Sequence, residues 1–183
     1  VSVGRLDQIL YPYYQKDIES GSMSKEKAQE LLEAYWIKFS EPIILYNSDT
    51  VRYWSGYPQG QCIVVGGQTP EGKDATNEVT YMCLKAQVHI GLGQPNLGAR
   101  IHKESPFEYI YEVAKVIRQG SGMPMIHNDE VYVPSLMARG ISLKEALDYG
   151  IHGCTESSIP GIWGRTNGGT FNFCLLYTSP SPR

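Results

Sequence analysis

The sequence predicts an α/β fold, because helical and strand-like segments alternate along its 183 residues. Apolar residues recur with a helical period over 24–39, 76–90 and 105–119. Short apolar runs at 61–66 and 123–127 lie between these helices and are bounded by glycine or proline. This alternation is typical of parallel or barrel-like sheets.

The first half of the chain contains two helices and one strand. Ser24 is a favoured N-cap for the helix of 24–39, and Glu26 lies in its first turn, where the helix dipole favours an acid. The expected buried face of this helix is Ala28, Leu31, Leu32, Tyr35 and Phe39. A Gly-rich turn connects the strand of 61–66 to the helix of 76–90. The expected inner face of that second helix is Val79, Met82, Cys83 and Ala86.

The second half contains two capping boxes. Ser105-Pro106-Phe107-Glu108 is expected to open the helix of 105–119, which stops at Gly120. Met123 to His127 is predicted to be a strand. Ser142-Leu143-Lys144-Glu145 is expected to open a short helix that ends at Gly150.

The composition is that of a soluble globular protein, with 42% hydrophobic residues, 19% charged residues and a net charge of -3. No basic run and no long apolar run occurs, so we expect neither a nucleic acid nor a membrane as partner. No signal peptide is recognisable, which favours a cytoplasmic protein with reduced thiols. The cysteine spacing matches no zinc motif.

The densest chemistry lies at 149–156, Tyr-Gly-Ile-His-Gly-Cys-Thr-Glu. Gly153 permits a tight turn that would present the Cys154 thiol on a loop tip. Glu156 could direct its carboxylate into the same cavity, giving one group for radical or nucleophilic chemistry and one for proton transfer. An isolated Cys-x-Glu is more often an inert cysteine beside a surface glutamate. A cysteine-nucleophile hydrolase with His127 or His152 as its base is a further alternative.

Two other motifs have a simpler interpretation. The loop of 67–74, Gly-Gln-Thr-Pro-Glu-Gly-Lys-Asp, resembles a phosphate-binding loop, but Asp74 replaces the hydroxyl that would bind magnesium. A plain turn is favoured over a nucleotide-binding module there. His127-Asn128-Asp129-Glu130 could bind a metal or act as acid and base. A strand end whose polar side chains cap the next turn is favoured, and no metal site is predicted.

Six blocks, in order, resemble the glycyl radical enzymes over residues 1–173. The blocks are Val3-Gly4-Arg5-Leu6-Asp7-Gln8 with Tyr11-Pro12-Tyr13-Tyr14, Gly66-Gly67-Gln68 with Gly72-Lys73-Asp74-Ala75-Thr76-Asn77-Glu78, Gln94-Pro95-Asn96 with Arg100-Ile101-His102, Gly120-Ser121-Gly122-Met123-Pro124, Asn128-Asp129-Glu130, and Asp148-Tyr149-Gly150 with Gly153-Cys154-Thr155-Glu156. Residues 174–183 form a Ser/Pro-rich tail that we expect to be non-native.

The resemblance implies an incomplete part of a ten-stranded α/β barrel, with the radical cysteine shielded on a loop at its centre. It implies that Cys154 becomes a thiyl radical and that Glu156 acts as general base or acid, with His127 and Asn167 as weaker predictions for the substrate pocket. A glycyl radical outside this chain, installed by a radical SAM activase, would supply the unpaired electron. A small polar substrate, a homodimer and an anaerobic cytoplasmic or microcompartment setting are implied as well.

Departures from the family pattern narrow the expected reaction. Gly153 stands where pyruvate formate-lyase has a second cysteine, which disfavours acyl transfer to formate, although this stays an alternative. Ser157 ends a Cys-Thr-Glu-Ser motif where glycerol-type dehydratases have Cys-Val-Glu-Pro, and Asn167-Gly168 replaces their His-Asp pair. These differences disfavour glycerol and propanediol. Glu156 favours a lyase that eliminates across a C–O, C–N or C–C bond, such as a dehydratase or decarboxylase. The fragment alone is expected to be inactive.

Overall fold

A computed structural model describes residues 2–42, 45–54 and 60–164. Its centre is a parallel sheet whose four strands lie side by side in chain order. The strands are β1 (Gly4–Arg5), β2 (Cys62–Gly66), β3 (Asn96–Ile101) and β4 (Met125–Asn128). The α/β class is therefore confirmed. Because all four strands run parallel, their carboxyl ends lie together at one end of the sheet.

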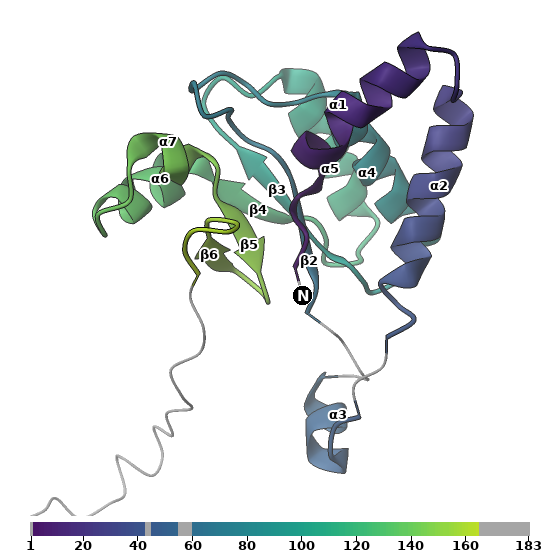
Figure 1. Ribbon diagram of the computed structural model, residues 1–183. Helices are drawn as coiled ribbons and strands as arrows, with labels where there is room; N and C mark the ends of the chain where they lie inside the picture. Colours follow the sequence, from purple (N-terminus) through teal and green to yellow (C-terminus); the bar gives the residue numbers. More distant parts are fainter. Residues whose placement is uncertain (1, 43–44, 55–59, 165–183) are drawn as a thin grey trace, which may run out of the picture.

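Two groups of elements cover the two faces of this sheet (Figure 1). The first group consists of α1 (Leu6–Glu19), α2 (Lys25–Lys38), α4 (Glu78–Ile90) and α5 (Phe107–Arg118). The second consists of α6 (Asp129–Met137), α7 (Leu143–Leu147) and an antiparallel hairpin of β5 (Gly150–His152) and β6 (Glu156–Ser158). A short helix, α3 (Ser48–Trp54), lies between α2 and β2 in the sequence.

The alternating side chains of β2 supply both cores. Ile63 and Val65 pack with the first group of helices, whereas Cys62 and Val64 pack with α6, α7 and β5. All four side chains are fully buried. Complete burial of an aliphatic side chain stabilises a fold by about 1.5–3 kcal/mol. The strand is therefore a well-anchored support for both faces.

Local capping was predicted correctly at two helices and wrongly at a third. The side chains of Ser24 and Ser142 cap α2 and α7 as expected, and Ser142 forms the complete box with Glu145. Ser105 does not cap α5, because its hydroxyl accepts the backbone N–H of His102 at 2.9 Å instead. The capping box that opens α4, formed by Asn77 and Thr80, was not anticipated.

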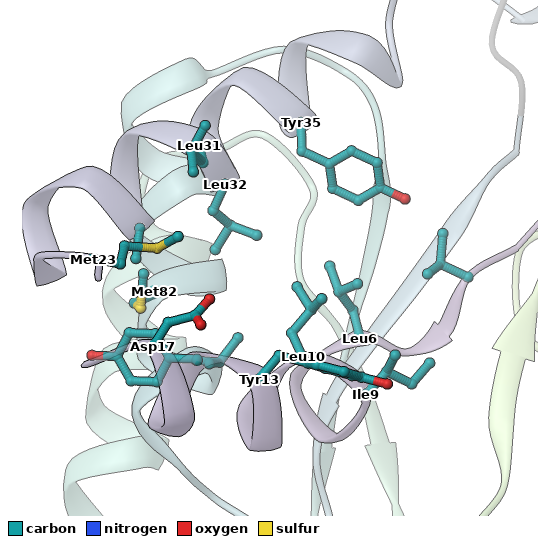
Figure 2. A pocket seen from close by; sticks show the side chains of 14 residues that line it. Leu6, Ile9, Leu10, Tyr13, Asp17, Met23, Leu31, Leu32, Tyr35 and Met82 are labelled. Atoms are coloured by element: carbon teal, nitrogen blue, oxygen red, sulfur yellow. The ribbon is translucent and has the colours of Figure 1, made fainter. Parts of the chain in front are cut away.

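The predicted buried face of α2 was partly wrong. Leu31 and Tyr35 are 48% and 38% exposed, while Trp36, which was not anticipated, is fully buried and donates to Gln87 across 3.0 Å. Leu31 and Tyr35 line an apolar groove of about 490 Å³ between α1 and α2 (Figure 2). The apolar face of α2 is wider than the surface that α4 covers. The groove contains one charged residue, Asp17.

Candidate active site

Cys154 lies at the tip of the β5–β6 hairpin. His152 pairs with Glu156 across the two strands, so the turn consists of Gly153, Cys154 and Thr155. The Cys154 side chain is exposed, as expected for a residue on a loop tip. Gly153 has a φ of +64°, and a Cβ there would come within 2.8 Å of a Glu156 carboxylate oxygen. Only glycine fits this position without strain.

The Glu156 carboxylate closes back over the turn. Its Oε2 accepts the backbone N–H of Cys154 at 2.7 Å and that of Thr155 at 3.0 Å. These N–H groups, that of Cys154 foremost, lower the pKa of Glu156 below its ordinary value. Glu156 is therefore ionised at neutral pH, two residues from the thiol.

Buried Arg100 ties the hairpin to the sheet. Its guanidinium forms a bidentate ion pair with Asp129, with both contacts at 2.9 Å, and donates to the carbonyls of Leu147 and Tyr149 at 2.9 Å. The same group lies 3.9 Å above the Tyr149 ring, whose hydroxyl donates to Asp129 at 2.9 Å. Arg100 thus satisfies the carbonyl of Leu147, the last residue of α7, and that of Tyr149, directly before β5.

A second arginine, Arg5 of β1, reinforces this junction. It donates to the Leu147 carbonyl at 3.4 Å, to Asp148 at 2.8 Å and to the Gly66 carbonyl at 3.1 Å. The helix predicted to end at Gly150 ends at Leu147, and that prediction was wrong. Gly150 instead begins β5 and pairs with Ser158 of β6.

His127 is 1% exposed and lies within the packing between β4 and α6. Its Nδ1 is 3.2 Å from the Tyr132 hydroxyl, and its ring faces Gly98. Burial, followed by the positive charge of Arg100, lowers the pKa of His127 to about 4, so the ring is neutral. In the described fold its ring does not reach an open surface, and its substrate role stays a prediction. Asn167 and the tail of 174–183 lie outside the described residues.

The two simpler interpretations agree with the structure. Gln68 and Asp74 bridge across the turn of 67–74, and the Asp74 carboxylate accepts the backbone N–H and the hydroxyl of Thr76. A carboxylate engaged in this way leaves a plain turn before α4. Asn128 caps α6 by accepting the N–H of Glu130 at 2.9 Å, as predicted for that strand end.

Nowhere in residues 2–42, 45–54 and 60–164 do three or more His, Cys, Asp or Glu side chains gather closely enough to hold a metal ion. Within the same residues, no helix has the length and apolar character needed to cross a membrane.

Sequence reasoning missed the residues that hold the hairpin. Arg5, Asn96 and Arg100 lie in the blocks that carry the resemblance, yet they were given no role. Asp129 was considered as a metal ligand, an acid or base, or a capping residue, but not as the partner of an arginine. The signal that could have identified the arginines is a charged residue inside or beside an apolar strand, since such a residue is buried only with partners. Cys62 carried no comparable signal, because a buried cysteine is ordinary in a core.

Comparison with known proteins identifies what this fold resembles. A family model described as pyruvate formate lyase-like matches residues 1–178. The isethionate sulfite-lyase of Nitratidesulfovibrio vulgaris is 44% identical over 172 residues, which are 93% of this chain and 21% of that protein. The chain therefore spans about a fifth of the length of this curated relative.

Solved structures agree with the sequence relatives. The glycerol-bound B12-independent glycerol dehydratase from Clostridium butyricum matches with a TM-score of 0.83 and 43% identity, over 88% of this chain and 20% of that one. A structure of 1,2-propanediol dehydration in Roseburia inulinivorans matches with a TM-score of 0.85 and 40% identity, over 87% and 20%. The fold described above corresponds to one part of these much longer chains.

Proposed function

Because the chain belongs to the pyruvate formate lyase-like family of glycyl radical enzymes, we propose that it carries the radical cysteine, Cys154, of a lyase that acts on a small polar substrate. Its four parallel strands are an incomplete part of the barrel of these enzymes. The observation that carries the proposal is the pairing of an exposed thiol at a turn with an ionised carboxylate, Glu156, bound to the same turn.

The chemistry divides between these two side chains. A glycyl radical elsewhere in the full-length protein, installed by a radical SAM activase, supplies the unpaired electron. The Cys154 thiyl radical removes a hydrogen atom from a hydroxyl-bearing carbon, which leaves a thiol and a carbon-centred radical. Glu156 accepts the hydroxyl proton, and the leaving group departs from the neighbouring carbon with its bonding pair. The product radical then takes the hydrogen atom back from the Cys154 thiol.

The names of the relatives indicate the kind of leaving group. Their names include dehydratases, which release water, and sulfite-lyases, which release sulfite. A β-substituted alcohol of two or three carbons fits both, and we propose this substrate class. Because its pKa is lowered, Glu156 is deprotonated at neutral pH, as a group that accepts the hydroxyl proton has to be.

Shielding of the radical has to come from polypeptide beyond this chain. Cys154 is exposed in the described fold, whereas a thiyl radical needs protection from water and oxygen. The remaining four-fifths of the length of the relatives is ample for this enclosure.

A homodimer in an anaerobic cytoplasm, or in a microcompartment, completes the proposal.

A cysteine hydrolase with His127 as its base receives no support, because Nδ1 of His127 faces the Tyr132 hydroxyl and burial lowers its pKa to about 4. His152 stays the other candidate base of that alternative. Acyl transfer to formate would require a cysteine at 153, where the positive φ strains any side chain and a Cβ would displace the Glu156 carboxylate.

The test uses the full-length protein, co-expressed with its activase without oxygen. We expect an organic radical in the electron paramagnetic resonance spectrum, followed by turnover of isethionate or a related β-substituted alcohol. Turnover that persists in air without activation would contradict the proposal.

A further inference from the structure

The backbone carbonyl just before Cys154 accepts two side-chain donors. The Cys62 thiol donates to the Gly153 oxygen at 2.9 Å, and the Asn96 amide donates to the same oxygen at 2.9 Å. Cys62 and Asn96 are register partners on the neighbouring strands β2 and β3, so they present their donors side by side. Both lone pairs of this carbonyl are therefore engaged by the sheet.

The carbonyl of the following residue, Thr155, is held as well. The hydroxyl of Tyr132, on α6, donates to the Thr155 oxygen at 3.4 Å and lies 3.2 Å from Nδ1 of His127.

We propose that Cys62, Asn96 and Tyr132 are positioning residues that fix the carbonyls of Gly153 and Thr155, the two neighbours of Cys154, and thereby set where its sulfur points. The proposal rests on the proposed function. Because the Cys154 and Thr155 side chains are exposed, their own packing does not hold the turn in the described structure. A displacement of about 1 Å at a reacting atom can cost about 100-fold in rate.

Cys62 is well suited to donate rather than ionise. Its side chain is fully buried, and the Ser2 hydroxyl accepts its backbone N–H at 3.2 Å. Burial raises the pKa of its thiol to about 11, so the thiol keeps its proton at any physiological pH. The competing interpretation is that Cys62 merely fills space, as a buried Cys83 does on α4.

The experiment compares variants of the activated full-length enzyme. For Asn96→Leu, Cys62→Ala and Tyr132→Phe we expect kcat to fall about tenfold, with KM within about twofold and the radical content unchanged. Cys62→Ser keeps a donor and should recover most of kcat. The matched control, Cys83→Ala, removes another buried thiol and should leave kcat unchanged.

A second measurement does not depend on catalysis. In the unactivated full-length protein, amide hydrogen exchange at 153–156 should rise about fivefold in Asn96→Leu and Cys62→Ala, but not in Cys83→Ala. If the parent enzyme carries the radical and turns over, and the variants keep the parental kcat and the parental exchange rate, the positioning roles are overturned. If exchange is faster in the variants but the parent never forms a radical, the positioning roles stand and the proposed function is refuted.

Discussion

The carboxylate of Glu156 accepts the backbone N–H of Cys154 at 2.7 Å, so the proposed base and the proposed radical residue share one turn. Glu156→Gln keeps an oxygen that can accept this N–H but cannot take a proton. We expect kcat of the activated full-length enzyme to fall by about 10²–10⁴-fold with the radical intact. The pH profile provides a second readout. Because the pKa of Glu156 is lowered, parental activity declines only as the pH falls through that low value, and the variant should lack this acid limb. An unaltered kcat would refute the base role.

The ion pair between Arg100 and Asp129 holds the guanidinium that donates to the Tyr149 carbonyl, directly before the hairpin. Both side chains are fully buried, so Asp129→Asn leaves an uncompensated guanidinium. We expect a loss of about 3–5 kcal/mol in unfolding free energy, measured from urea midpoints of the full-length protein. Glu30→Gln, which breaks the exposed pair with Lys27, is the control and should change stability by less than about 0.5 kcal/mol. Equal effects of the two substitutions on the unfolding free energy would refute a stabilising role for the buried Arg100–Asp129 pair.

Gly98 leaves space for the His127 ring. A Cβ at 98 would come 3.1 Å from two ring atoms of His127. Gly98→Ala should therefore force the ring aside and destabilise the protein by about 1–3 kcal/mol, seen as a lower Tm. Gly93→Ala is the matched control, because a Cβ there meets no atom within 4 Å. A Tm for Gly98→Ala at or above that of the parent would contradict the packing described here.

His127 makes stability depend on pH. Its pKa is lowered to about 4 in the fold against about 6.5 when unfolded, so the unfolded chain binds the extra proton. Its contribution, at most about 3 kcal/mol, is complete above pH 6.5 and declines as the pH falls toward 4. We expect His127→Asn to flatten the stability slope between pH 6.5 and 5. A slope that is unchanged in His127→Asn would refute the buried, neutral state.

The sequence predicted those features that depend on neighbouring residues. Ser24 and Ser142 lie within three residues of the N–H groups that they cap, so their motifs were sufficient. Ser105 had the same local pattern, but the turn of the chain after β3 offered its hydroxyl a different donor, the His102 N–H. Capping boxes were thus reliable only where no preceding turn competed.

Features that depend on distant residues were not predictable from one sequence. The β5–β6 hairpin has strands of only three residues, and the donors that position it, Cys62 and Arg100, are 91 and 49 residues away from their acceptors at Gly153 and Tyr149. No local propensity encodes such contacts. The loop-tip position of Cys154, by contrast, followed directly from Gly153, since glycine before a reactive residue permits the positive φ of a tight turn.

The most direct test of the central claim is Cys154→Ser in the full-length protein, activated without oxygen. A serine hydroxyl has nearly the shape of the thiol but an O–H bond too strong to be broken by a carbon-centred radical. We therefore expect the glycyl radical to form at the parental level while product formation falls below detection, with Cys83→Ser retaining parental turnover. Turnover by Cys154→Ser at the parental rate would contradict the assignment of the radical to Cys154.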